Sequence, residues 1–132
     1  MQLTPILFVE AIEPCLDFWE KGLGFERLGE VPGDDGLAFI MLGRGAARLM
    51  YQTRKSLADD LPDISAALPE NNPSFLYLRV DDLKPVIAGL DALGSEVTVE
   101  RRETFYGADE IGYKEPGGHF VIFAHFPGDA ED

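Results

Sequence analysis

The sequence contains a single cysteine, Cys15, among its 132 residues. One cysteine cannot form an intramolecular disulfide and cannot supply a cysteine metal cluster. No stretch is long and apolar enough to cross a bilayer, and the opening residues MQLTPILFVE lack the basic region and cleavage pattern of a secretory signal. We therefore expect a cytoplasmic protein that makes no contact with a membrane.

Basic residues are also few, because 11 lysines and arginines stand against 24 aspartates and glutamates, for a net charge of −13. A field of this sign repels nucleic acid phosphates, so nucleic acid is not expected as a partner. The same field would attract cations, although the acidic residues could equally serve only to keep the protein soluble. Apolar residues make up 45% of the chain, which is enough for one folded domain with a core.

The hydrophobic pattern predicts strand, helix and three strands, and then the same order again. The predicted strands are 4–12, 25–31, 37–43 and 46–52 in the first half, and 74–80, 95–102, 108–115 and 119–126 in the second. One helix should begin at Glu13-Pro14 and end by Gly24, and the other should be capped by Asp81 or Asp82 and end at Gly94.

The whole chain, 1–132, is therefore predicted to form one domain made of two modules. Residues 1–52 form the first βαβββ module and residues 74–127 the second. Residues 53–73 are polar and contain three prolines, which predicts a connecting segment with at most one short helix. Residues 128–132 should form a disordered acidic tail.

Three segments resemble the vicinal oxygen chelate superfamily, which includes glyoxalase I, extradiol dioxygenases, fosfomycin-modifying enzymes and bleomycin resistance proteins. FWEKGLGFERLG (18–29) resembles the end of its first helix, and VDDLKPVIAGLDALG (80–94) its second helix. FYGADEIGYKEPGGHFVIF (105–123) resembles its closing hairpin, with Glu115 in place of the usual aspartate. The resemblance implies an α+β fold in which two βαβββ modules form a curved mixed sheet around a cleft.

In the enzymes of this superfamily, four inward side chains bind one divalent metal. The positions that match them by resemblance hold Thr4, Arg48, Phe75 and Ile122. None is an ordinary ligand of such a site, and Arg48 would place a permanent positive charge where the cation should lie. We therefore expect no metal at these positions and no cofactor.

The two histidines, His119 and His125, cannot replace the missing ligands. Six residues separate them, which is roughly 20 Å along an extended strand, so they cannot bind one metal together. We expect His119 at the exit of a turn and His125 at the end of a strand, both partly solvated. Neither is expected to be catalytic, and Cys15 is expected to be a small core residue of the first helix.

Alternation along the strands predicts a cleft face of aromatic and aliphatic side chains, opposite a core face that includes Leu7, Val9 and Leu49. A face of this kind suits a ligand with flat, apolar parts, but the same aromatic side chains could simply fill the barrel. Arg48 and Arg79 would need an acidic partner if buried, such as Glu110 or a ligand carboxylate. The predicted ligand-binding residues are Phe8, Arg48, Met50, Phe75, Tyr77, Tyr106, Glu110, Phe120 and Ile122.

The resemblance favours a non-catalytic protein like the bleomycin resistance proteins, a homodimer that sequesters a small aromatic, in some cases cationic, ligand and thereby confers resistance. Two alternatives remain open. One is a metal-dependent lyase or dioxygenase of the glyoxalase type with relocated ligands, for which Glu10, Glu110 and His119 are candidates. The other is a structural or regulatory module whose cleft is plugged. The modules could pair within one chain or be exchanged between the chains of a dimer.

Overall fold

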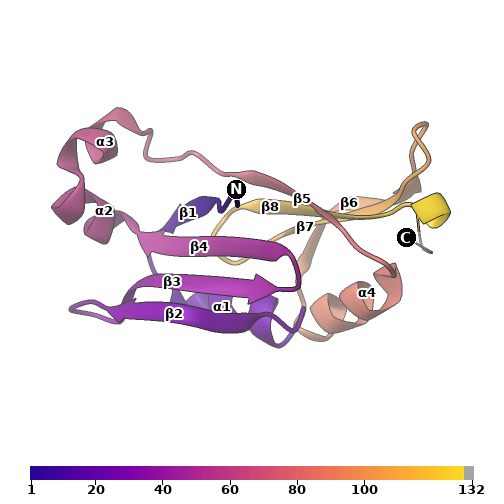
Figure 1. The fold of residues 1–132 in the computed structure, drawn as a ribbon, viewed down its shortest axis with the longest axis horizontal. Helices are drawn as coiled ribbons and strands as arrows, with labels where there is room; N and C mark the ends of the chain where they lie inside the picture. Colours follow the sequence, from indigo (N-terminus) through magenta and orange to yellow (C-terminus); the bar gives the residue numbers. More distant parts are fainter. Residues whose placement is uncertain (130–132) are drawn as a thin grey trace.

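A computed structural model of the chain describes residues 1–129, and it contains two four-stranded mixed sheets (Figure 1). Sheet A comprises β1 (Ile6–Val9), β2 (Glu26–Pro32), β3 (Leu37–Arg44) and β4 (Ala47–Thr53), in the order β1-β4-β3-β2. Sheet B comprises β5 (Phe75–Arg79), β6 (Glu96–Glu103), β7 (Asp109–Lys114) and β8 (Phe120–His125), in the order β5-β8-β7-β6.

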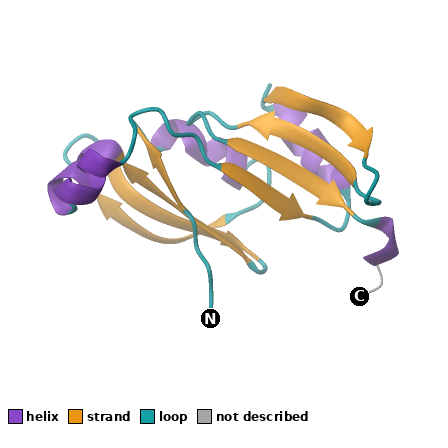
Figure 2. Ribbon diagram, turned by 90° about the horizontal axis from the view of Figure 1, so that it is seen from above, coloured by secondary structure: helices purple, strands orange, loops and turns teal. Residues whose placement is uncertain are grey.

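Both sheets have the same topology, because the first strand of each lies parallel to the last and the other pairs are antiparallel. Helix α1 (Glu13–Glu20) follows the first strand of sheet A, and helix α4 (Leu83–Ala92) follows the first strand of sheet B. Figure 2 shows the two sheets side by side as separate units. The predicted α+β fold of two βαβββ modules is therefore confirmed.

The prediction that the segment between the modules contains at most one short helix is wrong. It contains α2 (Arg54–Asp60) and α3 (Pro62–Ala67). The hydroxyl of Thr53 caps α2 by accepting a hydrogen bond from the backbone N–H of Ser56 at 3.1 Å. Pro62 stands in the first turn of α3, where its missing N–H costs no hydrogen bond, so this proline starts a helix instead of preventing one.

The end of the chain also differs from the prediction. Gly128 and Asp129, which the sequence assigns to a disordered tail, belong to a single 3-10 turn, η1 (Pro127–Asp129). Residues 130–132 lie outside the described residues. None of the helices in residues 1–129 combines the length and the apolar character needed to span a membrane.

One face of each sheet packs against the helices and forms a core that both modules share. Alternate strand residues are buried there, as predicted for Leu7, Val9 and Leu49. The modules also meet through glycine, because a Cβ atom added at Gly89 of α4 would lie 2.0 Å from the carbonyl oxygen of Gly22. Only glycine fits this approach of two backbones, which fixes α4 against the end of α1.

We call the opposite face of each sheet its outer face. The outer face is much more open to solvent, and Phe75 of β5 is 66% exposed on it. The edge strand β2 is exposed as well, since every one of its residues is open to solvent. The outer faces therefore carry apolar side chains that the described residues do not cover, and the functional site has to be sought there.

Candidate functional site

Six of the nine predicted ligand-binding residues lie on sheet B: five in its ladder, and Tyr106 in the β6–β7 turn. Phe75 lies opposite Phe120, and Tyr77 lies opposite Ile122, on the parallel pair β5–β8. On the other side of β8, Glu110 of β7 lies opposite Ala124, two residues beyond Ile122. Since residues directly opposite in a ladder point to the same face, all these side chains belong to the outer face of sheet B.

Glu110 is the polar centre of this face, and it is fully buried. Its Oε2 atom accepts a hydrogen bond from the hydroxyl of Tyr77 at 2.5 Å, across β8, and a second one from the hydroxyl of Tyr106 in the β6–β7 turn. Its Oε1 atom accepts from Nη2 of Arg102 at 3.2 Å, and Arg102 lies opposite Glu110 on β6. Three elements thus supply donors to one carboxylate.

These donors determine the ionisation of the site. Burial alone would raise the pKa of the Glu110 carboxyl, but the hydrogen bonds from Tyr106, Tyr77 and Arg102 outweigh burial and lower this pKa. The pKa of the Tyr77 hydroxyl is raised, first by burial and then by its hydrogen bond to Glu110. Glu110 is therefore the anion of the cluster, and the Tyr77 hydroxyl is a neutral donor.

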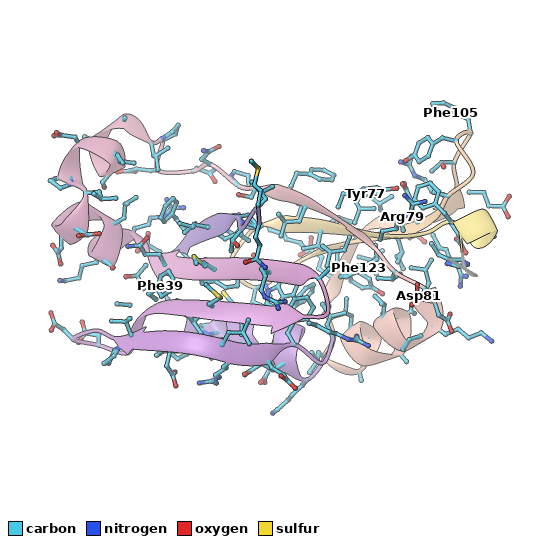
Figure 3. All side chains as sticks on the ribbon, in the orientation of Figure 1. Phe39, Tyr77, Arg79, Asp81, Phe105 and Phe123 are labelled. Carbon is cyan, nitrogen blue, oxygen red and sulfur yellow. The ribbon has the colours of Figure 1, made fainter. Side chains whose placement is uncertain are left out.

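Aromatic pairs lie at both ends of this face, with Phe75 and Phe120 at the start of β8 and Tyr106 and Phe126 at its end, beside Glu110. The rings of Phe75 and Phe120 lie 6.4 Å apart, and those of Tyr106 and Phe126 lie 6.3 Å apart. The guanidinium of Arg79 stacks on Phe126, with Cζ 3.9 Å from the ring centre. Figure 3 shows Tyr77 and Arg79 together on β5, and Phe105 at the tip of the hairpin beyond them.

The other three predicted residues, Phe8, Arg48 and Met50, lie on the outer face of sheet A. The structure therefore does not bring all nine residues together on one sheet.

Arg48 does not bind the predicted acidic partner, Glu110. Its Nη1 atom donates to the carbonyls of Gly45 and Ala47, both at 2.7 Å. Glu110 is bound by Arg102 instead, because the two lie opposite each other in sheet B.

The four positions that correspond to the metal ligands of the related enzymes do not fit a metal here. Phe75 and Ile122 have no donor atom in their side chains, and Arg48 carries a permanent positive charge. Thr4 lies before β1 begins. Within residues 1–129, no three side chains of His, Cys, Asp or Glu are grouped so that they could hold a metal ion.

His119 differs from the prediction, because it is buried and not partly solvated. Its Nδ1 atom accepts a hydrogen bond from the N–H of Ser74 at 2.8 Å, and its Nε2 atom donates to the carbonyl of Phe8 at 2.9 Å. A ring with partners on both nitrogens can be buried at little cost. His125 is partly exposed at the end of β8, as predicted, and its Nδ1 atom lies 3.3 Å from the carbonyl oxygen of Val80.

A second buried network lies beside His119, on the core side. Trp19 donates to the hydroxyl of Tyr51 at 2.8 Å, and that hydroxyl donates to Glu115. Glu115 also accepts from the backbone N–H of His119 at 2.5 Å. Cys15 is buried near Glu115, as predicted for a core residue; burial, and next the charge of Glu115, raise the pKa of its thiol. This thiol is a poor nucleophile.

Sequence reasoning missed Arg102 and Phe126. Arg102 belongs to a strand whose charged residues look like an ordinary solvated edge, and only its register with β7 shows that it faces Glu110. Phe126 is the last residue of the predicted strand 119–126, but β8 ends at His125, and the contacts of Phe126 with Arg79 and Tyr106 depend on the path of the chain after β8. Knowledge of the β6–β7 register would have identified the first of them.

Comparison with protein families gives a match over residues 2–123 to the family described as the Glyoxalase/Bleomycin resistance protein/Dioxygenase superfamily. Comparison with curated proteins gives no match. Among solved structures, TioX from Micromonospora sp. ML1 is similar with a TM-score of 0.74 and 14% identity, over 96% of this chain and 98% of that one.

Two further solved structures show the same fold. Lactoylglutathione lyase from Agrobacterium tumefaciens has a TM-score of 0.73 and 14% identity, over 95% of this chain and 92% of its own. A glyoxalase-related enzyme from Fulvimarina pelagi has a TM-score of 0.75 and 18% identity, over 96% and 89% respectively. Identities this low show a shared fold and do not distinguish a binding protein from an enzyme.

Proposed function

The chain belongs to the glyoxalase/bleomycin resistance protein/dioxygenase superfamily, and we propose that within it the protein is a metal-free binding protein of the bleomycin resistance type. It sequesters a small aromatic ligand, which can also carry positive charge, on the outer face of sheet B. The observation that carries this proposal is the exposed ring of Phe75 beside Phe120, on the same face as the buried Glu110 carboxylate.

The chemistry of the face favours binding over catalysis. Aromatic rings at the surface offer a stacking platform for a flat ligand. The carboxylate of Glu110 already accepts hydrogen bonds from three side chains, and the thiol of Cys15 is buried on the core side of the structure. A micromolar dissociation constant needs roughly 8 kcal/mol of net binding free energy, which a few such contacts can supply.

The exposed outer faces also support the proposal of a homodimer. Ile6 on sheet A and Phe75 on sheet B are both exposed, and a second copy would cover such apolar side chains. If sheet A of one copy faces sheet B of the other, Phe8, Arg48 and Met50 are brought to the same cleft as the six predicted residues of sheet B. The partners we propose are thus a small molecule and a second copy, and the proposed location is the cytoplasm.

The proposal is tested by metal analysis of the purified protein, followed by a thermal-shift screen with cationic aromatic compounds in the presence and absence of a chelator. We expect substoichiometric metal, a melting temperature that the chelator leaves unchanged, and stabilisation by some of the aromatic compounds. A stoichiometric divalent metal, together with a turnover that the chelator abolishes, would overturn the proposal in favour of a lyase or dioxygenase.

A further inference from the structure

The two phenols that donate to Oε2 of Glu110 are held in different ways. Tyr77 lies within β5, and the β5–β8 ladder fixes its backbone. Tyr106 lies in the β6–β7 turn, between Phe105, which is fully exposed, and Gly107, which has a φ of +87°. Figure 1 shows this turn projecting away from the body of the molecule. The Tyr106 donor can therefore leave the carboxylate more easily than the Tyr77 donor.

The side chain of Tyr106 covers Glu110 without being buried itself. Tyr106 is about half exposed; its ring contacts Phe105 and Phe126, and its hydroxyl contacts Glu110 and the hydroxyl of Tyr77. Glu110 is nevertheless fully buried. If Tyr106 swings outward, a slot opens that is bordered by the ring of Phe126 and ends at Oε2 of Glu110. This oxygen atom then keeps the hydrogen bond from Tyr77 and has lost the one from Tyr106.

We propose that Tyr106 occupies the place of the ligand, and that the ligand presents a phenolic ring which displaces it from Glu110. This inference rests on the proposed function and deepens it, because it names the group that the site recognises. The phenol of the ligand would donate to Oε2 beside the Tyr77 hydroxyl, and its ring would take the place of the Tyr106 ring against Phe126.

The charges around Glu110 favour a neutral donor at this point over an ammonium group. Oε1 already binds the guanidinium of Arg102, and the guanidinium of Arg79 lies on the adjoining Phe126 ring. A second cation on the same carboxylate would be repelled by these charges. An ether or a carbonyl group could not replace the lost donor either, because two acceptors would then face each other. A phenol keeps both the number of donors and the local charge unchanged.

The test uses 4-methylphenol, which has the structure of the tyrosine side chain, and 4-methylanisole, in which the hydroxyl is methylated and cannot donate. Both are titrated by NMR or calorimetry into the wild-type protein and into Tyr106→Phe. Tyr106→Phe keeps the ring but removes the competing hydroxyl, so we expect it to bind 4-methylphenol at least fivefold more tightly than wild type. 4-methylanisole cannot donate to Oε2, so we expect it to bind each protein at least fivefold more weakly than 4-methylphenol does.

Tyr113→Phe is the matched control. It removes a hydroxyl from the core face of β7, the strand that also carries Glu110, and in the wild-type protein this hydroxyl donates to Asp91 at 3.1 Å. This variant should bind both compounds as wild type does.

Glu110→Gln should reduce the preference for 4-methylphenol over 4-methylanisole at least fivefold. This preference is the ratio of the two affinities measured on one protein, so a small loss of stability does not change it.

Equal affinity of wild type and Tyr106→Phe for 4-methylphenol would overturn the inference. It would also be overturned if 4-methylphenol showed no saturable binding to either of these two proteins. Those outcomes are distinguishable from failure of the proposed function. If cationic aromatic compounds still bind and depend on Phe75, only the phenol subsite is lost. If no aromatic compound of any kind binds, the proposed function fails with it.

Discussion

The Nε2 atom of His119 lies 2.9 Å from the carbonyl oxygen of Phe8, a residue 111 positions earlier in the chain. Because Nδ1 of the same ring accepts from the N–H of Ser74, Nε2 carries the hydrogen and donates it. One imidazole ring thus joins β1 of the first module to the segment that leads into β5 of the second. The histidine that the sequence places at a solvated turn is a buried link between the modules.

Replacing His119 should therefore cost stability. We expect His119→Ala to lower the free energy of unfolding by about 2–4 kcal/mol, because the N–H of Ser74 and the carbonyl of Phe8 lose their buried partner. Urea denaturation followed by circular dichroism measures the change. His125→Ala is the matched control and should cost less than about 1 kcal/mol, since this ring is partly exposed. Equal losses for the two variants would show that the His119 link does not stabilise the fold.

Glu110 should make the stability of the protein depend on pH. Its pKa is lower in the folded protein than the ordinary value of about 4.3 for glutamate. A lowered pKa means that the folded state binds the proton less well than the unfolded state does, so the stabilisation is complete above the ordinary pKa and is lost as pH falls through the folded pKa.

The variant Glu110→Gln tests this dependence, since its side chain does not titrate. The difference in unfolding free energy between wild type and Glu110→Gln should be largest near neutral pH and should shrink as pH falls below about 4. Chemical denaturation at a series of pH values from neutral to acidic measures it. A difference that stays constant or grows as pH falls would mean that Glu110 is not held as an anion in the folded state.

The sequence was informative wherever the governing interaction is local. Alternation separated Leu7 and Val9, which are buried, from Phe8 on the outer face, because the period of a strand is fixed by its own backbone. It could not place His119, whose two partners lie 111 and 45 residues away. Burial of a polar ring depends on which backbone groups the fold brings to it, and no local pattern encodes that.

The same distinction explains what was and was not predicted of the site. Strand alternation predicts Tyr77 on the cleft face, and the need of a buried arginine for an acidic partner points to Glu110; the ladder of sheet B brings these two residues together. Arg102 was missed because its role follows from its register opposite Glu110, and β6 pairs with β7 through irregular steps that alternation cannot anticipate. A two-residue period cannot be carried across such an irregularity.

We expect the protein to be a homodimer at tens of micromolar, with a mass twice the 14.5 kDa of the chain in light scattering. Met50→Glu places a charge on the outer face of sheet A, and it should weaken the dimer at least tenfold if that face meets sheet B of a second copy. Leu61→Glu alters an exposed leucine between α2 and α3 and should leave the dimer intact. A monomeric wild-type protein at these concentrations would contradict the proposed cleft between copies.

Phe75 should contribute to affinity through stacking. Its ring is 66% exposed and lies beside Phe120, so truncating it removes contact area for a ligand and leaves the core intact. We expect Phe75→Ala to weaken binding of a cationic aromatic compound from the thermal-shift screen by about 1–3 kcal/mol, the range for losing a well-packed aromatic contact. Ile64→Ala, which truncates an exposed side chain of α3, should leave the affinity unchanged.

Salt separates this contact from long-range attraction. The net charge of −13 attracts a cationic ligand from a distance, and about 0.15 M salt screens that attraction beyond roughly 8 Å. Wild type and Phe75→Ala should therefore both bind more weakly as salt rises, while the difference between them stays constant, because stacking is not screened. Calorimetry of the two proteins at low and high salt measures both effects. Equal affinity of the two proteins would remove Phe75 from the site, and binding that does not change with salt would remove the electrostatic attraction.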